Sequence, residues 1–573
     1  MNTAEVLSLL VRRMILAFVL CGIAWSPLPY AQNAPAEKSS TSTASPAQSQ
    51  AKSPSAQASQ QSSPPAQEPD NEKDEVKITP SQAEELFHSV DEILEFDSKQ
   101  TGLPIKHEVK RRLTSRDEVV SYLTKHVDDE DTQRLRRSEL VLKKFGLLPP
   151  DFNLETFLVA LLREEVAGYY DPKTKTVNLL DWVPMEEQEP VMAHELTHAL
   201  QDQSFGLQKW MQKGDKDLAK VRRDLTPLDI ENDEIDDARE AVVEGQAQAM
   251  MFQYAIAPTG RTIVDSPDLV DAMETETMTG TSSTKVFNEA PIFMKESLTF
   301  PYSYGMEFVI DLMRKGGKGQ AFEGVLKNPP HTTRQIMQPE TYLSGERIVP
   351  IPVPDFKRDF KDYQRFDVGA MGEFDVAVLV EQYAGKALSK QMYPEWRGGY
   401  YYAANPKQNL GADSTITGPL GLLYVSRWSS ADAAAEFAGI YAHSLKERYK
   451  KIEEVDAAPK PAVNNPVQEK STQNKSTPDK SDQLQDHAPP AADSAQAAQT
   501  KSEAESETEP ELEPETKPAP TIDPLKGRHA WATEDGAVVI EEQGDTVLVS
   551  ESLDPATTAT VEKEVFASQP SAK

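Results

Sequence analysis

The sequence predicts an α+β protein with a mainly helical N-terminal domain and a C-terminal unit built on a sheet. Two observations predict this class. Apolar residues recur at helical spacing through most of residues 77–350, whereas strand-like apolar runs separated by turn residues gather after residue 366. At 573 residues the chain also exceeds one ordinary domain. We therefore expect ordered domains at 77–365 and 366–455, the second completed by 526–568.

Residues 1–31 have the pattern of a secretory signal peptide. Arg12 and Arg13 precede the apolar run MILAFVLCGIAW, and Ala31 is a suitable cleavage residue. The run is shorter than the roughly 20 residues that a membrane-spanning helix needs. We therefore expect a protein exported to the periplasm or the extracellular space, which contacts the membrane only if the signal segment stays uncleaved.

Two polar segments are predicted to be disordered. Residues 32–76 are rich in Ser, Ala, Gln and Pro, and residues 456–525 contain the acidic run SEAESETEPELEPET. Neither segment has enough apolar residues to offset the conformational entropy lost on ordering. We interpret both as solvated spacers; a calcium or cell-wall contact is the alternative for the acidic one.

Composition excludes several kinds of site. The formal net charge of −32 argues against nucleic acid as a partner, because a phosphate backbone is bound by Lys and Arg. The one cysteine, Cys21, lies in the signal segment, so the mature chain has neither disulfides nor thiolate ligands. Any metal site must therefore use histidine and carboxylate.

The 77–365 domain begins with a helix in ITPSQAEELFHSVDEILEF, after a Thr/Ser start. A short strand is predicted in PIKHEVKRRLT, and helices follow in DTQRLRRSELVLKKFGLL and NLETFLVALLREE. Residues 166–170 and 176–180 then predict a β-hairpin, because the DPK between them is typical of a turn. Three more helices are predicted, in EPVMAHELTHALQDQ, in EIDDAREAVVEGQAQAMMFQYAI and in FPYSYGMEFVIDLMRKGG, whose Gly pair favours a helix end.

The C-terminal unit is predicted to mix helices and strands. GEFDVAVLVEQYAGKAL reads as a helix, GGYYYAAN and GPLGLLYVSRW as strands, and SSADAAAEFAGIYAHSLKERY as a helix with Ser at its N-cap. Two further strands flank EQGD within 526–568. A lone hairpin is only marginally stable, so we expect this one to complete the sheet of 366–455. The unit's concentrated aromatic residues are interpreted as core, and the unit as a supporting or exosite domain.

The segment HELTH carries the chemistry. His194 and His198 lie one helical turn apart on one face and can bind a common metal ion, while Glu195 is turned by about 100° from the first histidine. A catalytic zinc site has three protein ligands and one water, and Glu195 can reach that water as a general base. The alternative is an amphipathic helix whose histidines are spaced by chance. We favour one zinc per chain and amide hydrolysis.

A third ligand is required from further along the chain. Glu240 and Glu244 stand one turn apart in AREAVVEGQAQAM, so one can bind metal while the other supports a ligand histidine. We favour Glu244, because Gly245 lets its helix approach the histidine helix closely. Asp202, four residues after His198, either orients a neighbouring group or is an ordinary solvated carboxylate, which is the commoner case. The remaining carboxylate candidates are Asp215, Asp217, Glu231 and Glu234.

These residues resemble a known group of enzymes. HELTHALQD resembles the active-site helix of thermolysin-type gluzincin metallopeptidases, and VVEGQA is similar to the Glu-Gly-x-Ala third-ligand signature of other gluzincins. The longer pattern VAGYYDPKTKTVNLL, PVMAHELTHALQDQ, FPYSYGMEF and PPHTTRQIMQPETYL resembles a group of predicted secreted bacterial metallopeptidases of unknown substrate. That likeness covers about residues 80–350.

The resemblance implies a zincin-like core in 77–365 that acts on a peptide or protein substrate. It implies zinc ligands His194, His198 and Glu244, with Glu195 as general base. It also implies that the strand preceding the HELTH helix pairs with an extended substrate. Gluzincins often add a Tyr or His that steadies the oxyanion, and the candidates for that role are Tyr302, Tyr304 and His331.

Two other functions remain open on the sequence. One is a zinc amidase that acts on a non-peptide or cell-wall amide, because the motif activates water without specifying the substrate pocket. The other is a catalytically idle, zinc-binding envelope scaffold. Glu195 argues against the scaffold, since a structural zinc site is closed by four protein ligands and needs no base.

Overall fold

The computed structural model describes residues 78–119, 129–165, 168–183, 185–211, 226–231, 234–279, 285–409, 418–456 and 520–568. The predicted signal peptide, the 32–76 spacer and nearly all of the acidic tract lie outside these ranges. The chain divides into two compact units, Met1–Ala457 with Ile522–Lys573, and Ala458–Thr521. All the described helices and strands belong to the first unit. It combines a mainly helical region with a separate sheet.

A small sheet begins the helical region. It has the order β1-β3-β2, with β1 (Lys110–Thr114) parallel to β3 (Thr176–Leu180) and β2 (Gly168–Asp171) antiparallel to β3. The predicted hairpin is thus confirmed. Its turn includes Lys175 in the left-handed region, at φ 60°. The β2 strand forms one edge of this sheet, so within the described residues one side of its backbone has no neighbouring strand.

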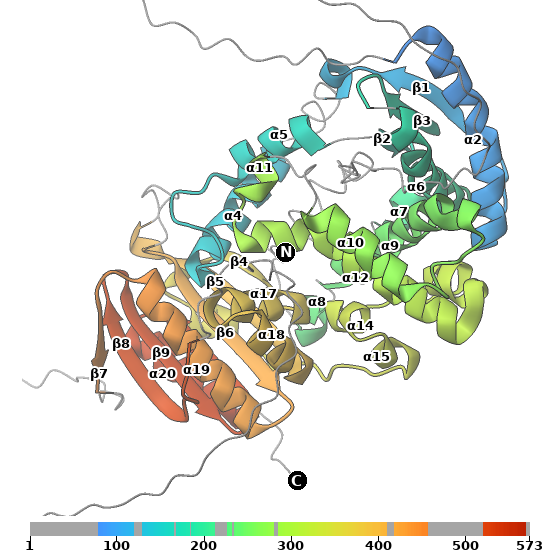
Figure 1. Ribbon diagram of the computed structural model, residues 1–573. Coiled ribbons are helices and arrows are strands. Elements are labelled where there is room, and N and C mark those ends of the chain that lie inside the picture. The colour runs from blue at the N-terminus through green and yellow to red at the C-terminus, as the bar shows by residue number, and fades with distance from the viewer. Residues whose placement is uncertain are drawn as a thin grey trace, which may run out of the picture. The chain divides into compact units, whose positions relative to one another are not determined.

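Four long helices form the core beside this sheet: α2 (Pro80–Thr101), α6 (Met185–Phe205), α9 (Ile235–Ile256) and α12 (Ile292–Gly319). α6 packs against α2, α9 and β2, and α9 packs along α12 (Figure 1). The start of α2 is set by a capping box, in which Gln82 N–H donates to Thr79 Oγ1 and Gln82 Oε1 accepts from Thr79 N–H. The Gly pair near the end of α12 includes Gly317 at φ 68°, which interrupts the helical backbone there.

Shorter elements complete the helical region. Within the described ranges, no helix is both long enough and apolar enough to cross a membrane. The shorter elements are α4 (Asp129–Phe145), α5 (Leu154–Glu165), α7 (Leu207–Met211), α8 (Pro227–Glu231), η3 (Ala257–Thr259), α10 (Pro267–Thr279), α11 (Lys285–Asn288), the π-helical turn η4 (Gln320–Gly324), α13 (Val325–Lys327), α14 (Thr333–Met337) and α15 (Pro339–Leu343).

The second sheet has seven strands in the order β4-β5-β6-β10-β9-β8-β7, all antiparallel to their neighbours. The last three strands therefore enter the sheet between β6 and β7. The strands are β4 (Tyr363–Ala370), β5 (Trp396–Pro406), β6 (Gly421–Trp428), β7 (Ile452–Val455), β8 (Gly527–Thr533), β9 (Gly536–Gln543) and β10 (Thr546–Glu551).

The end of the chain is richer in structure than the single predicted hairpin. β9 and β10 flank the EQGD turn as expected, but β8 adds a third strand through a second two-residue turn, where Thr533 pairs with Gly536. The segment GRHAWAT does not read as a strand, because only two of its residues, Ala530 and Trp531, are buried. A final helix, α20 (Pro555–Ser568), follows the sheet.

Helices cover both faces of the seven-stranded sheet. On one face Trp428 stacks on Phe437 of α19 (Ala431–Arg448), with ring centroids 4.5 Å apart. On the other face Tyr402 stacks on Phe356 of α16 (Phe356–Asp359) at 4.1 Å, and α20 packs nearby. The aromatic residues of this unit are buried, as expected of core residues: Trp396, Tyr400, Tyr401, Tyr402 and Trp428.

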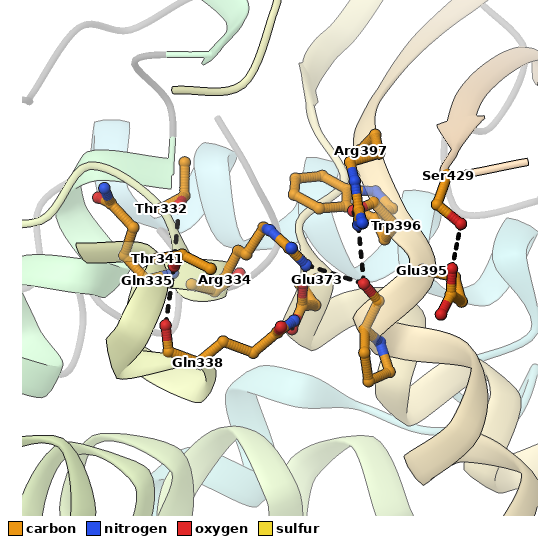
Figure 2. Close-up of polar contacts among 12 residues, drawn as sticks. Thr332, Arg334, Gln335, Gln338, Thr341, Glu373, Glu395, Trp396, Arg397 and Ser429 are labelled. Carbon is orange, nitrogen blue, oxygen red and sulfur yellow. Dashed lines mark hydrogen bonds and ion pairs between the residues drawn. The ribbon is translucent and has the colours of Figure 1, made fainter. Parts of the chain in front are cut away.

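A buried ionic junction joins α14 to α17 (Glu373–Ala384), which precedes α18 (Lys386–Met392). Arg334 donates from Nη1 to Glu373 at 2.7 Å and from Nε to Glu346 at 3.0 Å, and Gln338 donates to Glu373 at 2.6 Å. Figure 2 shows Arg334 directed at Glu373, while Arg397 reaches the carbonyl of Pro394. The HTTRQIMQ segment therefore fixes the start of α17.

Candidate metal centre

The two histidines of HELTH lie on one face of α6, with ring centroids 4.8 Å apart and ring planes at 81°. α6 packs against α9, and this contact brings Glu244 opposite the histidines. All three side chains are buried, with exposed fractions of 0–1%. His194, His198 and Glu244 are the one group among the described residues whose side chains can together hold a metal ion.

Three atoms of this group form a nearly equilateral triangle. Nε2 of His194 lies 3.1 Å from Nε2 of His198 and 3.2 Å from Oε2 of Glu244, and His198 Nε2 lies 3.4 Å from the same oxygen. Ligand atoms at about 2.0–2.1 Å from a tetrahedral zinc ion are roughly 3.3–3.4 Å apart. The triangle therefore has nearly the dimensions that a zinc ion requires.

Hydrogen bonding alone does not account for the triangle. Although burial would raise the pKa of Glu244, the facing His198 and His194 hold that pKa below its usual value, so the carboxylate only accepts. A ring nitrogen either donates or accepts. The nitrogen that accepts across the 3.1 Å contact has no hydrogen to give to Glu244. One of the three contacts is thus repulsive, whereas a cation between the three atoms would satisfy them all.

Two buried oxygen atoms at the site, Oε1 of Glu244 and Oε2 of Glu195, have no hydrogen-bond partner among the residues that the structure describes. A buried carboxylate oxygen without a partner is costly unless a ligand compensates it. The donor set of two imidazoles and one carboxylate is also the set found in catalytic zinc sites. The residues present therefore fit a metal ion of the kind that zinc is.

Glu195 lies beside the triangle. Burial raises its pKa to about 8, although His198 and the backbone N–H of Tyr170 in β2 act to lower it. A side chain on Gly168 would lie 2.9 Å from Val191 and 3.8 Å from Cγ of Glu195, so β2 runs directly over this turn of α6. The edge strand thus holds Glu195 through its backbone.

Glu240 is buried on α9 but is not part of the metal-ligand group. The expected close approach of Gly245 to the histidine helix, however, is wrong. Gly245 lies against Gly305 of α12, where an added Cβ would be 2.1 Å from the Gly305 carbonyl carbon. The glycine therefore allows α9 to approach α12, and not the histidine helix.

The three candidate oxyanion donors are in different surroundings. Tyr302 lies beside the triangle, with its ring 6.2 Å from that of His194, and burial together with Glu244, Glu240 and Glu195 raises its pKa. Tyr304 packs against Phe300 and lines a small pocket with residues of α17 and α18. His331 is largely exposed; partial desolvation of its ring lowers its pKa, and Arg239 and Arg347 lower it further. Only Tyr302 is brought to the site.

Asp202 is not a solvated carboxylate, contrary to the commoner expectation. It is 5% exposed, and Oδ2 accepts from the Tyr170 hydroxyl at 2.9 Å and from Lys175 Nζ. Tyr170 thus contacts α6 twice, through its hydroxyl at Asp202 and through its N–H at Glu195. Asp202 therefore fixes the hairpin over α6.

Of the remaining carboxylate candidates, only Glu234 has a described side chain. Asp215 and Asp217 lie outside the described residues, as does the side chain of Glu231. Glu234 is buried at the start of α9 and accepts from Thr333 Oγ1 at 2.6 Å, near the α14–α17 junction.

Gln201 and Gln246 were not anticipated from the sequence. Nδ1 of His198 lies 2.9 Å from Oε1 of Gln201, and Gln201 Nε2 lies 2.9 Å from Oε1 of Gln246. The available signal was the position of Gln201, one helical turn after His198 and one turn before the helix end. Gln246 gives no such signal, because its role depends on how α6 packs on α9.

Comparison with known proteins gives no relative whose site could be set beside this one. No protein-family model, curated protein or solved structure matches the chain significantly.

Proposed function

We propose that the protein is an exported, zinc-dependent metallopeptidase that hydrolyses peptide bonds. The observation that carries the proposal is the buried triangle of His194, His198 and Glu244 with Glu195 beside it. A structural zinc site would be closed by a fourth protein ligand, and the described residues offer three. The proposal of export depends on the signal-peptide pattern of residues 1–31 alone.

The protein residues have distinct roles in this proposal. Bound zinc supplies Lewis acidity, which lowers the pKa of a water molecule and polarises the substrate carbonyl. Glu195 accepts the proton of the attacking water and then donates it to the leaving amine. Its unpartnered Oε2 is available for this transfer, and the Tyr170 N–H holds the carboxylate in place. Tyr302 is the residue best placed to donate a hydrogen bond to the oxyanion.

The β2 strand supports a peptide as the substrate. As the edge of its sheet it has one side on which the described part of the chain places no strand, and it runs beside Glu195. An extended peptide that adds to this edge would be held by backbone hydrogen bonds, which are independent of its side chains. Its scissile bond would then lie close to the metal triangle.

The test is digestion of a diverse peptide mixture by the zinc-loaded protein, read by mass spectrometry. Glu195→Gln removes the base but keeps the shape of the side chain. The matched control is Glu189→Gln, because Glu189 lies on the same helix and bonds Ser89 and Tyr254 instead. We expect cleavage by the wild type and the control, with a loss of at least about 100-fold in Glu195→Gln.

Equal cleavage by Glu195→Gln would reject the proposed role of this residue. No cleavage by a folded, zinc-loaded wild type would reject peptide hydrolysis. The next substrates to assay would then be cell-wall amides, and inactivity on those as well would leave a zinc-binding scaffold.

A further inference from the structure

A chain of buried amide groups runs from the candidate metal site to a distorted helical turn. Gln201 and Gln246 are both fully buried. Gln246 Nε2 donates to the carbonyls of Ala321 and Phe322 at 2.7 and 3.2 Å, and Gln201 Nε2 donates to Gln246 Oε1 at 2.9 Å. The other end of Gln201 faces the Nδ1 atom of His198 at 2.9 Å.

The direction of donation along this chain is determined by its far end. Backbone carbonyls only accept, so Gln246 must direct its NH₂ group at Ala321 and its oxygen at Gln201. Gln201 must then direct its own NH₂ group at Gln246, which leaves its oxygen facing His198. A second carbonyl gives the same answer independently, because Gln201 Nε2 also donates to Val243 O at 3.0 Å.

This polarity has a consequence for His198. An amide oxygen at Nδ1 requires a hydrogen on Nδ1, so the lone pair of the neutral ring is on Nε2. Nε2 is the atom that belongs to the triangle with His194 and Glu244. Val243 directly precedes Glu244, so Gln201 also ties the histidine helix to the backbone beside the carboxylate ligand.

The Gln246 end of this series of amide groups depends on a turn that departs from α-helical geometry. In a regular α-helix the N–H of Val325 would donate to Ala321 O. In the π-helical turn η4, Val325 N–H donates to Gln320 O and Phe322 O instead. This displacement releases Ala321 O, and Gln246 takes that acceptor at 2.7 Å. Single π-turns are often associated with functional sites.

We propose that Gln201 and Gln246 are positioning residues that fix the tautomer and ring orientation of His198 for metal binding, with the π-turn η4 as their anchor. The two glutamines touch neither substrate nor metal. The two glutamines form a relay of amide groups that is electrically neutral. This relay therefore orients His198 without adding a second buried negative charge to the one that Glu244 already provides. The inference rests on the zinc binding that the proposed function requires, but not on peptide hydrolysis.

The experiment compares the zinc affinities of methionine variants of the full chain, measured with a competing chromophoric chelator. Methionine has nearly the volume of glutamine but forms no comparable hydrogen bonds. We expect Gln201→Met to weaken zinc binding about 10- to 100-fold. Gln246→Met should cost less, because Val243 O still orients Gln201. The double variant should bind zinc as weakly as Gln201→Met, because the effects of two groups in one series of hydrogen bonds are not additive.

Gln253→Met is the matched control. Gln253 is a buried glutamine on α9, the helix of Gln246, and it bonds Arg261 and Ile263, away from the site. It should lose comparable stability yet bind zinc like the wild type. A visible spectrum with Co²⁺ in place of zinc should change in Gln201→Met and stay unchanged in Gln253→Met, because it reports ligand geometry and not stability.

The outcomes separate this inference from the proposed function. Wild-type zinc affinity in a folded Gln201→Met protein would overturn the relay and leave the peptidase proposal intact. An equal loss in Gln253→Met would also overturn it, since the effect would then be general to the core. Weaker binding in Gln201→Met alone supports the relay even if no peptide is cleaved. A wild type that binds no zinc would overturn both.

Discussion

Gly245 and Gly305 bring the backbones of α9 and α12 into direct contact. A Cβ on Gly245 would lie 2.1 Å from the carbonyl carbon of Gly305, and a Cβ on Gly305 would lie 2.2 Å from Ala241 O. Glu244 adjoins the first glycine, and Tyr302 lies one helical turn before the second. This contact therefore sets the spacing between the candidate metal ligand and the candidate oxyanion donor.

Gly305→Ala should destabilise the protein and disturb the site together. The added methyl group would meet rigid backbone, so we expect a loss of about 3 kcal/mol or more in the free energy of unfolding. Gly319→Ala is the control on the same helix, where an added Cβ meets nothing within 4 Å. It should change stability by no more than about 1 kcal/mol. Chemical denaturation measures both, and equal stabilities would show that the helices can separate at no cost.

Glu244→Ala should abolish tight zinc binding, whereas Glu240→Ala should retain most of it. The reason is that Glu244 Oε2 lies 3.2 and 3.4 Å from the two imidazole nitrogens, while Glu240 stands outside the group. Isothermal titration of the metal-free proteins with zinc measures the difference. If Glu240→Ala is the variant that loses zinc, the ligand assignment is reversed.

Tyr302→Phe should lower kcat about 100-fold and leave KM and zinc content nearly unchanged, because an oxyanion donor acts mainly in the transition state. Tyr304→Phe is the control two residues away, where the ring faces α17 and not the metal triangle. We expect it to retain wild-type kcat on any peptide found to be a substrate. Similar kcat values for Tyr302→Phe and the wild type would remove Tyr302 from the mechanism.

The sequence predicted local features well and long-range partners poorly. The spacing of His194 and His198 follows from one helix, and the hairpin over residues 168–180 follows from its turn residues. By contrast, the role of Gly245 depends on which helix crosses α9, and spacing along the chain does not reveal that. Asp202 and Gln201 were missed or misjudged for the same reason, since their partners Tyr170 and Gln246 lie on other elements.

The buried Glu234 should make stability depend on pH. Burial raises its pKa to about 8, with Asp375 and Glu373 adding to the effect and the Thr333 hydrogen bonds opposing it. An acid whose pKa is raised on folding stabilises the fold fully only below its ordinary pKa, and this contribution is lost as the pH rises through about 8. Glu234 should therefore cost on the order of a few kcal/mol of unfolding free energy between about pH 5 and pH 8.

Glu234→Gln should flatten this part of the pH profile, because the amide keeps the shape and does not ionise. Denaturation in urea at a series of pH values is the measurement. Glu323→Gln serves as the control, since Glu323 is exposed and pairs with Lys327. A Glu234→Gln profile as steep as that of the wild type would contradict the assignment.

Replacing Ala458–Thr521 with a flexible linker should leave thermal stability almost unchanged. These residues separate from the unit that holds the described helices and strands, and β7 and β8 on either side already pair, with Val455 opposite Ala530. A longer deletion that also removes 522–526 should be destabilising, because Leu525 N–H donates to Ala435 O of α19 at 2.8 Å. Thermal unfolding of the two deletions side by side tests both statements, and a large drop in the first would show that the acidic unit supports the sheet.

The place of β10 in the large sheet bears on how the chain is synthesised. β6 ends at Trp428 and every one of its residues is buried in the finished sheet, yet its partner β10 begins only at Thr546. While the polypeptide is being made, β6 therefore exposes an unpaired, apolar edge until β10, more than 100 residues later in the chain, has also been synthesised. Such an edge is a template for pairing with other chains. Nascent and prematurely terminated products should thus depend on chaperones, and full-length chains should escape aggregation only once β10 is in place.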